Sequence, residues 1–201
     1  MDLGRFVRNL ALWAVPVILV WLALTPIYNR LLIRGVENVV QGIETPNKTR
    51  LRVHETHYAL VYHKDVKVNT STGHVGSFRM TDVQFTVLFV GLLFLSVPEV
   101  PTRRRFEALG WGLLAMAFFH LLLGVFRVQF VYATQLGQWS LDNYSAFARN
   151  FWGLGKHVLD LAFKFALPLA LWSLFYLDRL LPQTEAARSP KGRRKVSEES
   201  L

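Results

Sequence analysis

The sequence contains no cysteine among its 201 residues. This absence excludes disulfide bonds, a thiol nucleophile and thiolate metal ligands. The motifs G-x-S-x-G and H-E-x-x-H and the Walker phosphate loop are missing as well, and no G-x-G-x-x-G stands between a strand and a helix. We therefore expect no cofactor, no metal and no catalytic residue, and the chain is not expected to be an enzyme.

Acidic residues are scarce, with 14 Asp and Glu against 23 Lys and Arg, a net charge of +9. In a soluble domain such an excess would indicate nucleic-acid binding. Here 52% of the residues are hydrophobic, and the basic residues gather at the ends of long apolar runs. Anionic lipid headgroups account for that placement. The expected partner is therefore the lipid bilayer and not nucleic acid.

Two apolar runs between Phe85 and Val131 flank three consecutive arginines, Arg103, Arg104 and Arg105. A helix of about 20 apolar residues crosses the ~30 Å apolar core of a bilayer. Because cytoplasmic loops collect Lys and Arg, this basic turn is expected to face the cytoplasm and to lie against its lipids.

Apolar stretches predict four transmembrane helices, at residues 9–28, 84–98, 107–131 and 157–177. The first could be a cleaved signal peptide, but its length and its Trp and Tyr residues favour a retained anchor that ends near Pro26. The second is short and is expected to begin as early as Arg79 or to be tilted. The predicted cytoplasmic segments are 1–8, 99–106 and 178–201, the last disordered, and the predicted outer segments are 29–83 and 132–156.

The long outer segment has two patterns. Apolar residues at helical spacing predict an amphipathic helix at 31–43, and an alternation of period two predicts a β meander at 49–69 with a third strand through Val66 and Val68. A polar loop, 70–76, follows. This lobe is too small to hold a core of its own and must pack on the helices or on a partner.

The predicted fold is thus an all-α integral membrane protein, with four transmembrane helices and a small extracytoplasmic β-rich lobe in the first loop. We expect it in the bacterial cytoplasmic (inner) membrane with both termini in the cytoplasm. The first loop carries eight basic residues, which runs against this orientation. Long exported loops obey the charge rule only weakly, so the assignment stands.

Ionisable residues inside the predicted spans form one candidate site. Arg127 and Asp160 lie at matching depth in the third and fourth spans, and His157, Asp160 and Lys164 share one helix face by their spacing of three and four. The cluster could bind a carboxylate, a lipid headgroup or a partner helix. Alternatively, Arg127 and Asp160 form an ion pair that joins two helices.

The histidines predict packing roles rather than ligation. His120 lies mid-span, and its companion His157 lies roughly 10 Å or more away in depth at 1.5 Å per residue, too far for a bis-histidine haem. The histidines of the lobe could bind zinc, but no carboxylate is placed to complete a ligand set. These residues are His54, His57, His63 and His74. Glycosylation-type triplets begin at Asn47, Asn69 and Asn143, all on the predicted outer side.

The order of these parts resembles the small exosortase H-associated membrane proteins over residues 5–182. A basic start leads into a first helix, a long outer segment follows, then a hairpin with the turn PTRRRFEAL, and last the helix KHVLDLAFKFALPLALW. The resemblance implies an accessory role beside an exosortase, a membrane transpeptidase that uses a cysteine nucleophile. A chain without cysteine would be the companion and not the enzyme.

Two other functions remain open. The chain could be a structural transmembrane subunit of an energy-transducing or secretion complex, in which its helices fill gaps around larger partners. It could also be a lipid-handling membrane enzyme that uses Arg127, Asp160 and Lys164. For the accessory protein and for the structural subunit, a larger membrane protein is the expected partner.

Overall fold

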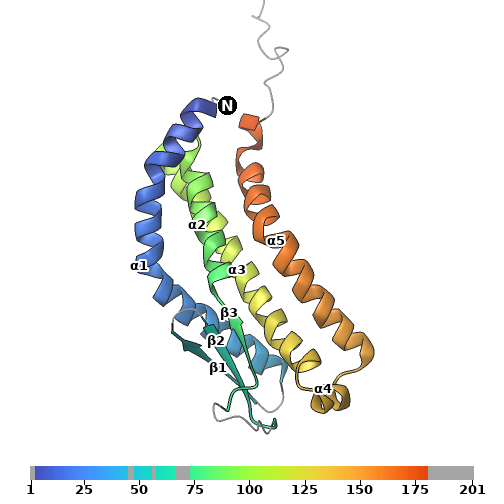
Figure 1. The fold of residues 1–201 in the computed structure, drawn as a ribbon. Coiled ribbons are helices and arrows are strands. Elements are labelled where there is room, and N and C mark those ends of the chain that lie inside the picture. Colours follow the sequence, from blue (N-terminus) through green and yellow to red (C-terminus); the bar gives the residue numbers. More distant parts are fainter. Residues whose placement is uncertain (1–2, 45–47, 56–57, 67–72, 181–201) are drawn as a thin grey trace, which may run out of the picture.

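The computed structural model describes residues 3–44, 48–55, 58–66 and 73–180. Four long helices run along one axis, and a small sheet lies at one end of them (Figure 1). The first residues of α1, the connection between α2 and α3, and the last turns of α5 lie at the other end. We call these the sheet end and the arginine end, the latter after Arg103, Arg104 and Arg105.

The first element, α1 (Leu3–Ile43), is one helix of 41 residues. The prediction that the first helix ends near Pro26 and that a separate helix follows at 31–43 is therefore wrong. Pro26 removes one backbone hydrogen bond, and α1 bends along its length (Figure 1). Beyond it a buried stripe continues at helical spacing, formed by Asn29, Ile33, Val36 and Val40. Packing of this stripe favours the helical conformation across the proline.

The sheet contains β1 (Thr49–His54), β2 (Tyr58–His63) and β3 (Gly76–Arg79), antiparallel in that order. The first two strands follow the predicted alternation, but the third is not where it was predicted. Val66 lies outside any strand, Val68 lies outside the described residues, and β3 begins at the end of the predicted polar loop. With four residues, β3 is too short to show a period of two in the sequence.

Glu37 of α1 and Glu44, the residue directly after α1, hold the sheet to the helices. The Glu44 carboxylate accepts hydrogen bonds from the backbone N–H groups of Lys48 and Thr49 at 3.3 and 3.0 Å, and Glu37 accepts one from Leu51 N–H at 3.0 Å. Apolar residues of β1 and β2 share one buried cluster with α1 and α3. The described residues of the lobe thus share their apolar core with the helices, as the small size of the lobe predicts.

The remaining helices are α2 (Thr81–Ser96), α3 (Thr102–Thr134), α4 (Gln138–Asn143) and α5 (Ala146–Leu180). Two predicted loops are largely helical. The basic turn 99–106 contains the first turn of α3, and the outer segment 132–156 contains the end of α3, all of α4 and the first eleven residues of α5. Ser145 is a signal for this early start, because its hydroxyl oxygen accepts a hydrogen bond from Ala148 N–H, three residues on, as an N-cap does.

Two helices, α1 and α3, are long and apolar enough to cross a membrane. The two parts of α5, Ala146–Leu161 and Lys164–Tyr176, are bent by 59° and would make a third span if counted as one. With 16 residues, α2 is about 24 Å long at 1.5 Å per residue, shorter than the ~30 Å apolar core. These features are compatible with a membrane protein, but the four predicted spans are not confirmed.

His63 lies where the sheet meets the helices, with its ring 5.0 Å from that of Tyr132 and 5.1 Å from that of Trp139. Burial lowers the pKa of His63, with a smaller contribution from Lys48, while Glu44 and Asp65 oppose the shift. The folded protein therefore binds fewer protons than the unfolded chain just below the usual histidine pKa of about 6.5. Stability should fall as the pH drops below that value.

This expectation is tested by NMR titration of labelled histidine side chains in detergent micelles, with His63→Gln to assign the signal. The His63 signal should titrate below about pH 6.5. The variant should also lose part of the decrease in thermal stability between pH 7 and 5, a range about the reference value. Titration at or above the reference pKa would contradict the assignment of burial as the dominant cause.

Candidate functional site

The ion pair that is one of the two predicted roles of Arg127 and Asp160, from their matching depth, is present between α3 and α5. The guanidinium of Arg127 donates to Asp160 Oδ1 from Nη2 at 2.6 Å and from Nε at 3.2 Å. Lys156, one turn before Asp160, places its Nζ 3.1 Å from the other carboxylate oxygen. The Arg127 side chain is 7% exposed and that of Asp160 is 23% exposed. One carboxylate thus holds two cations at a largely buried position.

Arg127 also joins these helices to the sheet. Its Nη1 donates to the backbone carbonyl of Arg79, the last residue of β3, at 2.6 Å, and its guanidinium lies 5.8 Å from the centre of the Phe78 ring. A single side chain therefore connects α3, α5 and the segment that leads into α2. Charged hydrogen bonds of this kind are about twice as strong as neutral ones.

The other two members of the predicted cluster lie differently. His157 is exposed, and its ring packs against Phe130 at 5.9 Å rather than facing Asp160. Lys164 lines the same cavity as Arg127 and Asp160. Lys156 lies in a predicted outer loop and is not among the predicted site residues, although a lysine four residues from an aspartate on a helix is a favourable pair. The early start of α5 is what places Lys156 beside Asp160.

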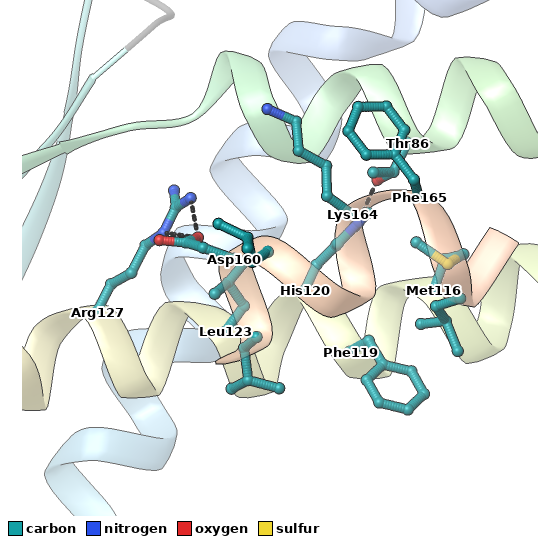
Figure 2. A pocket seen from close by; sticks show the side chains of 12 residues that line it. Thr86, Met116, Phe119, His120, Leu123, Arg127, Asp160, Lys164 and Phe165 are labelled. Atoms are coloured by element: carbon teal, nitrogen blue, oxygen red, sulfur yellow. Dashed lines mark hydrogen bonds and ion pairs between the residues drawn. The ribbon is translucent and has the colours of Figure 1, made fainter. Parts of the chain in front are cut away.

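A cavity of about 460 Å³ lies between α3 and α5 and reaches Thr86 of α2. Figure 2 shows Arg127 and Asp160 toward one end of it and Met116 at the other. Apart from the charged cluster, His120 and Thr86, its lining is apolar. Its volume lies in the ~300–1,000 Å³ range of small-molecule sites. The arrangement fits a molecule with a charged end and an apolar body.

His120 is a packing residue in this structure, as the sequence predicts. It is 4% exposed, and its two ring nitrogens lie 2.5 Å from the Tyr28 hydroxyl and 2.7 Å from the Thr86 hydroxyl. Figure 2 shows the contact with Thr86. A neutral imidazole has one donor and one acceptor, so both nitrogens are engaged. This hydrogen-bonded chain links α1, α3 and α2 across the bundle.

The arginine triplet has a structural and an exposed part. Arg105 donates from Nε to the Val100 carbonyl at 2.8 Å and from Nη1 to the Leu95 carbonyl at 3.1 Å. It therefore satisfies a carbonyl that the last turn of α2 leaves without an intrahelical partner. Arg103 and Arg104 are exposed, and Arg103 pairs with Glu107 at 2.9 Å. The side chains of Arg103 and Arg104 thus reach the surface where the predicted lipid contact would lie, whereas the half-buried Arg105 uses Nε and Nη1 within the protein.

The lobe histidines do not form a cluster in the part of the chain that the structure describes. The register pairs His54 with Tyr58 and His63 with Thr49, at opposite ends of the β1–β2 ladder. His74 packs on Tyr62, and His57 lies outside the described residues. Among all the residues that the structure describes, no group of three or more His, Asp or Glu could hold a metal ion.

Of the glycosylation-type triplets, those of Asn47 and Asn69 begin outside the described residues. Asn143 ends α4 and donates its side-chain N–H to the Trp139 carbonyl at 2.8 Å.

Comparisons of the chain with protein-family models, with curated proteins and with solved structures found no match. The function must then be inferred from the geometry of the chain itself. That geometry consists of an ion-paired cluster, a mainly apolar cavity beside it and a second apolar cavity between α1, α2 and α3.

Proposed function

We propose that this chain is a non-catalytic integral membrane accessory protein that docks a larger membrane enzyme in a bacterial protein-sorting or export system, for example an exosortase. The observation that carries the proposal is an open apolar groove of about 450 Å³ between α1, α2 and α3. It has the dimensions and the lining to receive apolar side chains from a partner helix.

The groove is lined almost wholly by hydrophobic residues, among them Trp13, Val17, Val20 and Trp21 of α1. Its two hydroxyl groups are already engaged, since Thr25 donates to the Trp21 carbonyl at 2.7 Å and Tyr28 contacts His120. A polar ligand would find few partners here. An apolar helix that packs into the groove would bury Val20, which is 57% exposed.

The polar groups of the bundle support the same proposal. Asp160 pairs with Arg127 and Lys156 inside the protein, and both ring nitrogens of His120 have partners there. Helices associate in membranes through close packing and small residues. At Gly91 of α2, a Cβ atom would stand 3.0 Å from Val17 Cγ1, so the base of the groove depends on such close packing.

The placement of basic residues supports an orientation with the arginine end toward the cytoplasm. Arg103 and Arg104 are exposed there, and Arg5 pairs with Glu99 of the α2–α3 connection at 3.3 Å. With this orientation the sheet end lies outside, and the first residues of α1 and the last turns of α5 face the cytoplasm. The lobe is then presented to exported proteins.

The proposal is tested by substituting Val20→Trp, which fills the groove, and Val15→Trp as a matched control. Val15 is 64% exposed on the same helix and does not line the groove. Tagged proteins are extracted from native membranes in mild detergent, and co-purifying chains are quantified by mass spectrometry. We expect one cysteine-containing, multi-spanning protein whose recovery falls about tenfold, or roughly 1.4 kcal/mol, with Val20→Trp only. A solitary, monodisperse wild-type protein would refute the proposal.

A further inference from the structure

We infer that a recess between β3, α3 and α5 binds the anionic headgroup of a membrane lipid. The recess has a volume of about 250 Å³ and is lined by Arg79, Arg127, Lys156, Asp160 and Phe130, with other residues of β3 and α3. It lies on the sheet side of the Arg127–Asp160 pair, and that pair also lines the larger cavity between α3 and α5.

The recess carries an excess of positive charge. Its described lining contains three cations, Arg79, Arg127 and Lys156, and one carboxylate. Asp160 is shared between Arg127 and Lys156, while the guanidinium of Arg79 lies 5.9 Å from the centre of the Tyr58 ring. An excess of two positive charges next to an apolar bundle is costly unless an anion approaches. Phosphate and carboxylate headgroups both supply that anion.

The length of α3 indicates how deep the recess lies in the bilayer. With 33 residues, α3 is about 50 Å long, which exceeds the ~30 Å apolar core by ~20 Å. If α3 extends equally at both ends, about 10 Å of helix stands beyond the core at the sheet end. Arg127 lies seven residues before Thr134, again about 10 Å from the end. The recess is then at the boundary between acyl chains and headgroups.

The neighbouring cavity favours a lipid over a soluble anion. Beyond the Arg127–Asp160 pair, the space of about 460 Å³ is lined mainly by apolar residues such as Met116 and Leu123 (Figure 2), and its polar lining there is Lys164, His120 and Thr86. A headgroup in the recess would therefore place an acyl chain beside an apolar surface. A soluble anion would use the recess and leave this cavity without a role.

The test measures lipid binding to the purified full-length chain in a neutral detergent by native mass spectrometry. Phosphatidylglycerol and phosphatidylcholine with identical chains are compared, followed by Arg79→Gln, Lys156→Gln and the matched control Arg52→Gln. Arg52 is also an exposed strand arginine over a tyrosine ring, at 5.7 Å from the centre of Tyr62, but it does not line the recess. Wild-type protein should bind phosphatidylglycerol about tenfold more tightly than phosphatidylcholine.

Both recess variants should lose most of this preference and Arg52→Gln should keep it. The bond from Arg127 to residue 79 uses the backbone carbonyl, so Arg79→Gln leaves it intact. Circular dichroism of the variants checks the fold independently. Equal binding of the two lipids by the wild type, or equal losses in Arg79→Gln and Arg52→Gln, would overturn the inference. Displacement of phosphatidylglycerol by millimolar inorganic phosphate would show a soluble-anion site and overturn the assignment to a lipid.

Discussion

Replacing Asp160 with asparagine should lower the free energy of unfolding by roughly 3–5 kcal/mol, because it removes one partner of a buried ion pair. The substitution keeps the shape of the side chain and removes its charge. Arg127, 7% exposed, then loses its anionic partner, and an asparagine oxygen can accept only weaker hydrogen bonds that lack the second charge. Lys156 loses the same carboxylate. Two cations are left without their anion at the edge of the bundle.

Arg127→Met should cost less, about 1–3 kcal/mol, a usual range for leaving a hydrogen-bonding group unpaired. In this variant Asp160 keeps Lys156 as a partner, and the main loss is the bond to the Arg79 carbonyl. The double variant Arg127→Met/Asp160→Leu should be more stable than Asp160→Asn, since apolar replacement of a whole pair is often tolerated. Lys156 can then extend its charged end toward water along the Phe130 ring, 5.3 Å away.

These values are measured by thermal or denaturant unfolding in detergent micelles, with Glu107→Gln as the control. Glu107 pairs with Arg103 at an exposed position, with side chains 58% and 91% exposed, so its loss should cost under about 1 kcal/mol. If Asp160→Asn were as stable as Glu107→Gln, the cluster would not hold the helices together. A well-folded Asp160→Asn protein that had lost a chemical activity would instead support the lipid-handling enzyme.

The sequence predicts the features that depend on one segment at a time. Long apolar runs locate the helices, alternation locates β1 and β2, and the matching depths of Arg127 and Asp160 predict their ion pair. The continuity of α1 past Pro26 depends instead on contacts with α3 and the sheet. No local pattern reports those contacts, and proline alone predicts an end.

The same reasoning explains the misplaced site residues. A helix predicted to begin at His157 leaves Lys156 in a loop. The spacing of His157 and Asp160 does not report that the His157 ring packs against Phe130. The helix in fact begins at Ala146, and its first turns pack with Gly155 against Phe126. Two glycines and an asparagine weaken the helical signal of 146–156, so packing rather than propensity determines the structure there.

A close approach of α1 and α3 at Gly124 provides the second large expected effect. A Cβ atom at this position would overlap Cγ2 of Val36, which is 1% exposed. Gly124→Ala should therefore destabilise the protein by about 1–3 kcal/mol, the usual cost of overpacking. This loss is expected although alanine is about 1 kcal/mol better than glycine within a helix. Small residues at helix crossings are a common device in membrane proteins.

Gly110→Ala is the matched control, because a Cβ atom at this other glycine of α3 would meet nothing within 4 Å. It should be neutral or stabilise the protein by up to about 1 kcal/mol. Val36→Ala removes the atoms that an alanine at 124 would strike, so the double variant Val36→Ala/Gly124→Ala should be more stable than the sum of the single effects predicts. A coupling of roughly 0.5–3 kcal/mol is expected for residues in contact. If the two effects simply added, α1 would not pack on α3 at this glycine, and the position of the lobe that α1 carries would have to be revised.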